Sequence, residues 1–455
     1  MTAGFASGRR EAFRQRFATR PSLLVAVGFA LAIAVGTALL LLPVATAAGS
    51  TDFVTALFTA TSAVCVTGLV VVDTGTHWSL FGQLVVLGLI QVGGLGIMTL
   101  ASLLGRLVFH RFSLRMRLTA QAETGSGELG GVRGLVSRIV LLSAVAEVVV
   151  TAVLWPRFAL SYGIPWDRAG YVAAFHAVSA FNNAGFSLYS DSLVRFAGDP
   201  LVCLPIAVAF ITGGIGYPVL IELRRRVRRP RRLSVHTRIA LGATALLIVG
   251  ATVVVTAAEW TNPATLGPMS PPDKLLAGFF QAVSPRTAGF NTVDVGSMHP
   301  GTWLFLDVLM FIGGSSAGTA GGIKVTTFAL LAFVLLAEIR AEPTVHVLDR
   351  QLPLGVQRQA LTVVLLSVGS VMATTGILLA LTPFSLDRVL FECVSAFATV
   401  GLSTGITTAL PPSSLVLLAA LMFLGRLGPV TLASALALRV RTRRYELPEE
   451  RPIVG

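Results

Sequence analysis

Apolar residues occur along this chain in runs of about 20, long enough for a helix to cross a bilayer. Eight such spans are predicted, in four pairs: 22–43 with 79–104, 135–156 with 200–222, 238–258 with 302–336, and 359–381 with 414–438. Between the members of each pair lies a shorter apolar stretch, such as 53–64 or 389–397. With only about 10 residues, such a stretch cannot cross the membrane, which favours a half-helix that enters and returns.

The same short motif follows each half-helix. It reads FTATSAVCVTGL from Phe58, FHAVSAFNNAGF from Phe175, FQAVSPRTAGF from Phe280 and FECVSAFATVGL from Phe391. Each copy has Phe, Ser four positions later, and then one Gly followed by Leu or Phe, and the glycines recur every 104 to 117 residues. In the third copy Ser284 stands five residues before its glycine instead of six, so local asymmetry is expected there.

A fixed period of this kind indicates an internal repeat. We therefore predict an all-α integral membrane protein, with four fused helix–half-helix–helix repeats around a central ion pore. The predicted divisions are an N-terminal segment 1–21, repeats 22–104, 105–222, 223–340 and 341–440, and a C-terminal tail 441–455.

Composition agrees with a membrane location. Of the 455 residues 54% are hydrophobic and 13% charged, against about 25% charged in soluble proteins, and the mean hydropathy is +0.78. The net charge of +13 would suit nucleic acid, but the arginines lie between apolar runs, as the positive-inside rule describes. No nucleic-acid partner is expected.

Charge placement predicts the orientation. Arginines concentrate in the N-terminal segment and in 106–138, 224–232, 340–358 and 439–444, all on the side away from the motifs. The motif side instead carries aspartates, namely Asp52, Asp73, Asp167, Asp191, Asp199, Asp273, Asp294 and Asp387. We expect both termini in the cytoplasm and the motifs to enter from outside. The run 224–232 has mainly a topogenic role in this interpretation, with anionic membrane lipids or an acidic cytosolic partner as further ligands.

The first apolar run has an alternative interpretation as a signal peptide, because arginines precede it and Ala45-Thr46-Ala47 follows it. Its length of about 20 residues exceeds the about 7–15 of a signal sequence, which favours a membrane span. The three cysteines, Cys65, Cys203 and Cys393, have no metal-ligand spacing and indicate neither a disulfide framework nor a metal site.

Four glycine loops around one axis would present rings of backbone carbonyl oxygens. Non-helical backbone is tolerated at membrane depth where it lines a watery cavity, and carbonyl rings replace the hydration shell of potassium in channel filters. Half-helices that point their C-terminal ends at the pore centre also favour a cation. The alternative is that these glycines serve helix packing; their common position between two spans favours a pore.

The sequence resembles the Ktr/Trk/HKT superfamily of potassium transporters. The resemblance covers nearly the whole chain and rests on AVSPRTAGFNTVD at 282–294, SAFNNAGFS at 179–187 and GGSSAGTAGGIK at 313–324. Because about 21 residues precede the first span, without two extra helices, the chain looks closest to the KtrB-type membrane subunit. This implies potassium uptake across the bacterial cytoplasmic membrane, sodium stimulation, a homodimer, and a cytosolic RCK/KTN-type nucleotide-binding ring that gates the pore.

The resemblance also implies a selectivity filter that binds potassium through backbone carbonyls. Carried residue by residue, it is Val66, Thr67, Gly68 and Leu69; Asn183, Ala184, Gly185 and Phe186; Thr287, Ala288, Gly289 and Phe290; and Thr399, Val400, Gly401 and Leu402. Each loop has a single glycine, so a less selective sodium/potassium transporter of the same fold is the alternative. Gly68 favours potassium, since some relatives with serine there prefer sodium.

The predicted span 302–336 is interrupted by small residues that make a poor helix, since glycine costs about 1 kcal/mol relative to alanine. They include Gly313, Gly314, Ser315, Ser316, Gly318, Thr319, Gly321 and Gly322. A flexible packing interface is one interpretation; the resemblance implies an intramembrane loop that gates the pore, closed on the cytoplasmic side by Lys324. Arg426, inside the last span, would cost several kcal/mol in lipid and is expected to face a cavity. The resemblance places it at the inner end of the filter.

Other chemistry is sparse. Glu147 in span 135–156 serves either helix–helix hydrogen bonding or an ion-related role. An intramembrane enzyme is disfavoured, because the sequence has no HExxH, GxSxG or paired intramembrane aspartates. It also lacks a GxxxxGK[ST] loop, so no organic cofactor is expected on this chain and nucleotide control would come from a partner.

Overall fold

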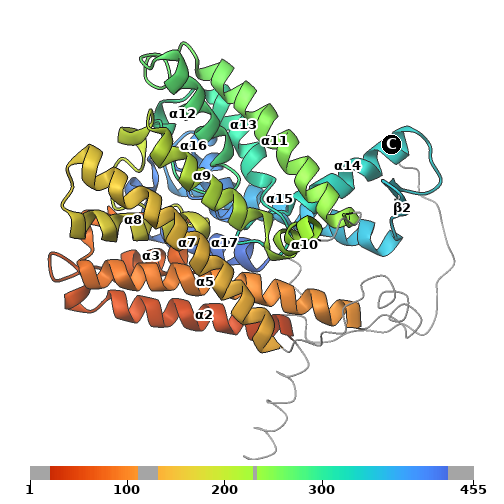
Figure 1. The fold of residues 1–455 in the computed structure, drawn as a ribbon, viewed down its shortest axis with the longest axis horizontal. Helices are drawn as coiled ribbons and strands as arrows, with labels where there is room; N and C mark the ends of the chain where they lie inside the picture. Colours follow the sequence, from red (N-terminus) through yellow and green to blue (C-terminus); the bar gives the residue numbers. More distant parts are fainter. Residues whose placement is uncertain (1–20, 111–131, 229–232, 429–455) are drawn as a thin grey trace, which may run out of the picture.

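The computed structural model describes residues 21–110, 132–228 and 233–428. Over these ranges the chain is helical apart from one two-stranded hairpin (Figure 1). The first quarter comprises α2 (Pro21–Leu40), η1 (Pro43–Ala45), α3 (Phe53–Val64), α4 (Thr74–His77) and α5 (Leu80–His110). The second comprises α7 (Val132–Tyr162), α8 (Trp166–Phe181), η2 (Val194–Phe196), α9 (Pro200–Ile215) and α10 (Tyr217–Arg228).

The third quarter comprises α11 (Val235–Glu259), α12 (Pro271–Val283), η3 (Val295–Ser297), α13 (Pro300–Phe311) and α14 (Val325–Ile339). The fourth comprises β1 (His346–Val347), β2 (Arg350–Gln351), α15 (Leu354–Leu381), α16 (Leu386–Ala398), η4 (Thr407–Ala409) and α17 (Pro412–Leu427). The two strands pair antiparallel, with Val347 opposite Arg350.

Capping residues fix where the helices begin. The Asp52 carboxylate accepts a hydrogen bond from the Thr55 N–H at 2.9 Å at the start of α3, and Ser234 caps α11 in the same way. A proline occupies an early position of α12, α13 and α17, where its missing N–H has no partner to lose. The short helices α3 and α16 lie where the half-helices at 53–64 and 389–397 are predicted, and their entry into the membrane and return stays a prediction.

Within the described ranges, three helices are long and apolar enough to cross a membrane on their own: Val136–Tyr162 within α7, α11, and α15. A fourth span forms if α9 and α10 are taken together, although they are bent by 99°. The predicted span at 200–222 is therefore not one straight helix, and whether this bent pair crosses the membrane stays a prediction. The chain turns at Gly216, whose φ of +89° is a conformation that favours glycine. The full set of eight spans stays a prediction.

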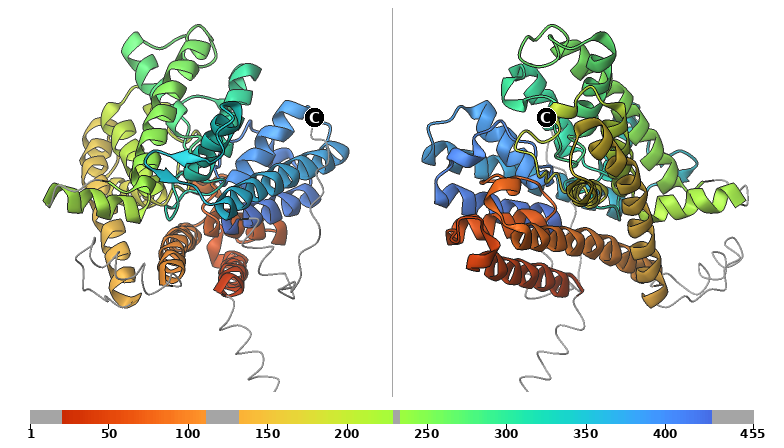
Figure 2. Two further views of the ribbon diagram at one scale, coloured as in Figure 1. Left: turned by 90° about the vertical axis from the view of Figure 1, so that its right-hand side faces the viewer. Right: turned by 60° about the vertical axis from the view of Figure 1, so that its left-hand side comes forward.

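Helices α3, α8 and α16 pack against the helices on both sides of them in the chain, α12 packs against α11, and each of the four also packs against a helix of the preceding quarter. Helix α8 contacts α5, α12 contacts α9, α16 contacts α13, and α3 contacts α17. The last of these contacts joins the fourth quarter to the first and closes a circle. In the left view of Figure 2, the colours of the sequence follow one another around the centre, from red and orange through yellow and green to blue.

The motif phenylalanines form part of the core. Phe58, Phe175, Phe280 and Phe391 are at most 1% exposed. Outward-facing apolar side chains are instead open, as at Leu160 and Leu246 with 75% and 74% exposure, which suits contact with lipid. The chain is a membrane protein by its apolar helices.

The described basic segments lie at one end of the molecule. The hairpin at 346–351, helix α10 and the C-terminal end of α5 are all toward the right of Figure 1. The arginine-rich segments 1–20 and 439–444, and most of 106–138, lie outside the described residues, as do 229–232. The cytoplasmic placement of the termini therefore stays a prediction.

Candidate ion-permeation site

The four motif glycines meet in a ring. A Cβ on Gly68 would overlap the carbonyl oxygen of Ala184, and a Cβ on Gly289 would overlap that of Val400. One on Gly185 would stand 3.0 Å from the Ala288 oxygen, and one on Gly401 would overlap the Thr67 oxygen. In every case the contact is with the residue before the glycine of a neighbouring loop, so the four loops close on one another. No side chain fits at any of the four glycine positions.

The loop backbone repeats as well. Two residues before each glycine stands a residue with positive φ: Val66 (56°), Asn183 (59°), Thr287 (72°) and Thr399 (51°). The glycines themselves have φ of 69° to 95°. A left-handed conformation is rare for β-branched residues and costs about 1–3 kcal/mol unless the surroundings impose it. Here the conformation is imposed by backbone hydrogen bonds at the C-terminal ends of the short helices.

Those bonds form Schellman motifs at three of the four helix ends. The N–H of Thr67 bonds to the Ser62 carbonyl at 2.8 Å, and that of Val66 to Ala63 at 3.1 Å; the ends of α8 and α16 repeat the pattern. At the third helix, Ala288 N–H reaches back only four residues, to Ser284. The third loop thus differs locally, because its serine is one residue closer to its glycine.

The motif serine holds each loop through its side chain. Ser62 and Ser395 accept hydrogen bonds from the N–H groups of Gly68 and Gly401, each at 3.1 Å. Ser179 donates to the Phe186 carbonyl at 2.8 Å, and Ser284 donates to that of Phe290. All four serines are fully buried.

A second set of loop-holding residues was missed from the sequence. It is the residue directly after each motif phenylalanine: Thr59, His176, Gln281 and Glu392, all buried. Three of them bond the chain after the filter: His176 Nε2 lies 3.0 Å from Ser187 Oγ, and Gln281 Oε1 accepts from Thr292 N–H at 3.3 Å. A polar residue at one fixed place in four otherwise apolar motifs was the signal available.

Glu392 makes the most extensive of these contacts. Its carboxylate accepts hydrogen bonds from Ser403 Oγ at 2.5 Å, from Thr404 N–H at 3.0 Å and from Thr407 Oγ1 at 2.8 Å. Because Glu392 lies on α16 and the donors follow the fourth glycine, the carboxylate ties the helix to the outer part of its own loop.

A cavity of about 240 Å³ lies on one face of the ring. All four motif glycines line it, together with residues that follow them in the chain and the carboxyl-bearing residues Asp73 and Asp294. Negative charge at the mouth of a narrow site raises the local cation concentration. The cavity therefore forms a vestibule suited to a cation.

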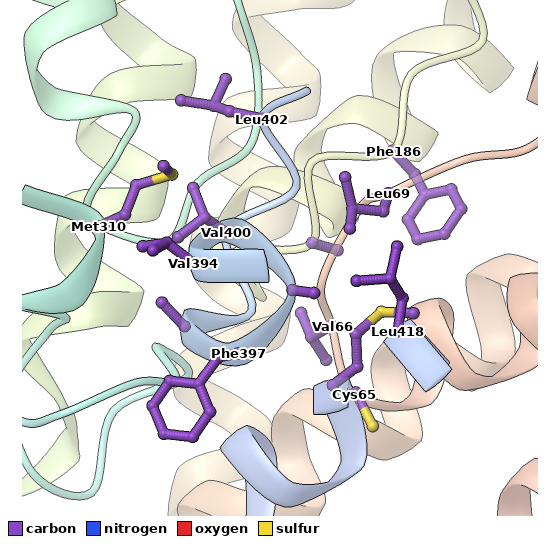
Figure 3. Packing of buried hydrophobic residues seen from close by; sticks show 14 of the residues in the cluster. Cys65, Val66, Leu69, Phe186, Met310, Val394, Phe397, Val400, Leu402 and Leu418 are labelled. Carbon is purple, nitrogen blue, oxygen red and sulfur yellow. The ribbon is translucent and has the colours of Figure 1, made fainter. Parts of the chain in front are cut away.

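Apolar side chains form the wall around the ring. Leu69, Phe186, Phe290 and Leu402, which follow the glycines, are at most 1% exposed. Figure 3 shows Val66 and Leu69 of the first loop, with Val400 and Leu402 of the fourth, among side chains such as Met310 and Leu418 from the surrounding helices. The predicted filter residues are thus brought together, with backbone toward the ring and these side chains in the wall.

The predicted interruption of span 302–336 is confirmed. Helix α13 ends at Phe311 and α14 begins at Val325. The intervening loop lies on the face of the ring opposite the vestibule, because it contacts residues that precede the filter glycines. Gly321 and Gly322 lie against Ala398 at the end of α16, and Thr319 lies against Phe181 at the end of α8. Most of the loop is buried.

Both predicted basic residues hold this loop. Lys324 Nζ donates to the Ala320 carbonyl at 2.6 Å. Arg426, 4% exposed, donates from Nη1 to the Thr319 carbonyl at 2.5 Å and from Nη2 to the Gly93 carbonyl at 3.3 Å. Gly93 lies on α5 and packs directly against the end of α3, because a Cβ on Gly93 would overlap the Val64 carbonyl. Arg426 therefore lies beneath the ring, between the loop and the first half-helix.

Glu147 lies in an interhelical hydrogen-bond network that reaches the end of α8. It accepts hydrogen bonds from Ser143 at 2.6 Å and from Gln91 Nε2 at 3.0 Å, and Asn182 Nδ2 lies 3.3 Å away. These partners join α5, α7 and the end of α8, so the contacts support the interpretation of Glu147 as a residue for helix–helix hydrogen bonding. The described residues contain no group of three or more His, Cys, Asp or Glu side chains that could hold a metal ion.

Comparison with known proteins identifies the family. The family model described as TrkH, cation transport protein, matches residues 5–443. The Ktr system potassium uptake protein B of Bacillus subtilis (strain 168) is 42% identical, over 92% of this chain and 93% of that protein. The protein of the same name from Vibrio alginolyticus is 41% identical, over 92% and 91%.

Two further relatives extend the comparison. The potassium/sodium uptake protein NtpJ of Enterococcus hirae is 33% identical, over 97% of this chain and 99% of that protein. The crystal structure of the potassium transporter TrkH from Vibrio parahaemolyticus has the same fold, with a TM-score of 0.72 at 18% identity, over 92% of this chain and 84% of that one. The chain belongs to the TrkH family of cation transport proteins.

Proposed function

We propose that this protein is the ion-translocating membrane subunit of a potassium uptake system, with the ring of glycine loops as its selectivity filter. The observation that carries the proposal is the contact of each motif glycine with the carbonyl of a neighbouring loop. Rings of backbone carbonyl oxygens are the ligands that replace the hydration shell of potassium in channel filters, and the close contact of the four loops supports such a ring here. The names of the 42% and 41% identical relatives support potassium as the ion.

The proposed pore has four repeats, 22–104, 105–222, 223–340 and 341–440, with eight spans. Ions enter through the vestibule from outside, pass the filter, and meet the loop at 313–322, which acts as the gate. Two features support this order: the vestibule carries Asp73 and Asp294, and the opposite face carries Lys324 and Arg426. Both termini are then cytoplasmic, in the cytoplasmic membrane of a bacterium.

The proposed system has further components. A homodimer and a cytosolic RCK/KTN-type nucleotide-binding ring complete it, and sodium stimulates it. The word "system" in the names of two relatives supports a partner of some kind. A less selective sodium/potassium transporter is the second candidate, supported by the single glycine in each loop and by the name of the 33% identical relative.

The test is cation flux into vesicles that contain the purified protein, with and without a regulatory ring of the proposed type. Potassium and rubidium uptake well above sodium uptake is expected, as is growth rescue of a potassium-uptake-deficient bacterium on low potassium. Equal sodium and potassium fluxes would favour the second candidate. No flux of any of the three cations from correctly folded protein would refute both.

A further inference from the structure

Thr319, in the middle of the 313–322 loop, bonds to three other parts of the molecule. Its N–H donates to the Gly213 carbonyl on α9 at 3.1 Å, and its carbonyl accepts from Arg426 on α17. Its hydroxyl donates to Asn183 Oδ1 in the second filter loop at 2.8 Å. The side chain is fully buried. One residue thus joins the proposed gate loop to two helices and to the filter.

Asn183 extends this chain of contacts within the filter. It is 1% exposed, has a φ of 59°, and its Nδ2 lies 3.4 Å from Oγ1 of Thr287, the corresponding residue of the third loop. The other loops have Val66, Thr287 and Thr399 at this position. Asparagine tolerates the left-handed conformation better than these β-branched residues, and among the four only its amide offers an N–H donor together with a carbonyl acceptor.

The contact with the fourth filter loop is of a different kind. Gly321 packs so closely on Thr399 that a Cβ on Gly321 would overlap the Thr399 Oγ1. The Thr399 hydroxyl nevertheless has no hydrogen-bond partner among the described residues. The alternative acceptor for the Thr319 hydroxyl, the Phe181 carbonyl, is farther away at 3.4 Å. The directional side-chain contact between loop and filter is therefore the bond from Thr319 to Asn183.

We propose that this bond couples the gate to the filter: movement of the loop breaks it and changes the ion preference of the second and third filter loops. The proposal rests on the proposed function, since it assigns Thr319 and Asn183 as positioning residues for that filter and gate. Coupling between two sites is reciprocal. The ion in the filter must then bias the position of the loop.

The experiment follows the loop with a cysteine reporter. Ser316 is partly exposed in the loop, and the native Cys65, Cys203 and Cys393 are buried, so Ser316→Cys gives one reactive thiol among the described residues. Its rate of modification by a water-soluble maleimide is measured in potassium and in sodium. We expect the two rates to differ about fivefold or more, the lower end of ordinary allosteric coupling.

In the reporter background, Thr319→Val removes the hydroxyl and keeps the shape and both backbone bonds, and the rate ratio should fall to near one. Thr319→Ser restores the hydroxyl and should restore the ratio. If Thr319→Val is not monodisperse, Thr319→Ala removes the same hydroxyl. An unchanged ratio in the hydroxyl-free variant, or a ratio of one in the reporter alone, overturns the coupling.

Potassium flux measured on the same preparations separates the two proposals. Absence of flux in the protein without any substitution, measured beside these preparations, counts against the proposed function. Normal flux together with a ratio that Thr319→Val leaves unchanged removes the coupling alone.

Discussion

The carbonyl oxygen of Thr67 occupies the place where a Cβ on Gly401 would stand, so the first glycine loop directly abuts the fourth. Because Gly401 also has a φ of +95°, a side chain there meets both a steric and a conformational obstacle. The two loops are 334 positions apart in the chain, and their contact closes the ring.

Gly401→Ala should therefore abolish potassium flux in vesicles or cut it by more than tenfold, because the carbonyls of adjacent loops must separate. Gly376→Ala is the matched control: Gly376 lies inside α15, and a Cβ there would have nothing within 4 Å. Wild-type flux and cation preference in Gly401→Ala would show that this ring is not the filter.

Ser395→Ala removes the acceptor for the Gly401 N–H in a buried site. An unsatisfied buried donor costs about 1–3 kcal/mol, so we expect a lower Tm and a reduced preference for potassium over sodium in competitive flux. Ser370→Ala, which affects an exposed hydroxyl on α15, should change neither. Unaltered cation preference in Ser395→Ala would mean that the serine supports folding and not filter geometry.

Arg426→Ala should change transport kinetics, since it removes a positive charge beneath the ring and the bond to Thr319. We expect a higher maximal potassium flux. Arg426→Lys keeps the charge but cannot reproduce the forked contact with two carbonyls, and should give an intermediate value. Arg358→Ala, at an exposed site near the start of α15, is the control. Kinetics of Arg426→Ala equal to wild type would exclude the role.

Deletion of part of the 313–322 loop should raise potassium flux, because the loop occupies the face of the ring opposite the vestibule. The measurement is initial uptake in vesicles, with folding followed by size-exclusion chromatography. Unchanged flux, or loss of flux from a normally folded protein, would contradict a gating role.

Glu392→Gln replaces a carboxylate that only accepts hydrogen bonds with an amide that must also donate. One of the donors from Ser403, Thr404 or Thr407 then loses its acceptor. We expect a destabilisation of about 1–3 kcal/mol, measured as a lower Tm, and weaker potassium preference. Glu338→Gln, at an exposed site on α14, should leave both unchanged. An unaltered Tm would show that the network is dispensable.

Much of this architecture could be predicted, because the length of an apolar run and its glycine content determine local structure through neighbouring residues. A run of about 10 apolar residues is too short to cross a bilayer, and short helices, α3 and α16, stand at both of the quoted runs. The small residues after Phe311 cannot continue a helix, which identified the loop before Val325. These features depend only on neighbouring residues.

The features that were missed depend on distant contacts. The bend at Gly216 cannot be predicted from the span 200–222, because one glycine in an apolar run has the same sequence whether it packs or turns. Likewise, the role of Gln281 and Glu392 depends on loop atoms 11 to 15 residues away in sequence. Asn183 was placed in the filter, but its bond to Thr319 spans 136 residues.

The 99° bend at Gly216 also fixes what lies next to the proposed gate. A Cβ at Gly216 would stand 2.8 Å from Gly318 N, and the Tyr217 N–H bonds to the Ala317 carbonyl at 3.4 Å. Helix α10, which carries Arg224, Arg225 and Arg226, therefore begins at a residue that is bonded to the loop. A protein that bound these arginines would therefore hold a helix whose first N–H is bonded to the loop proposed as the gate.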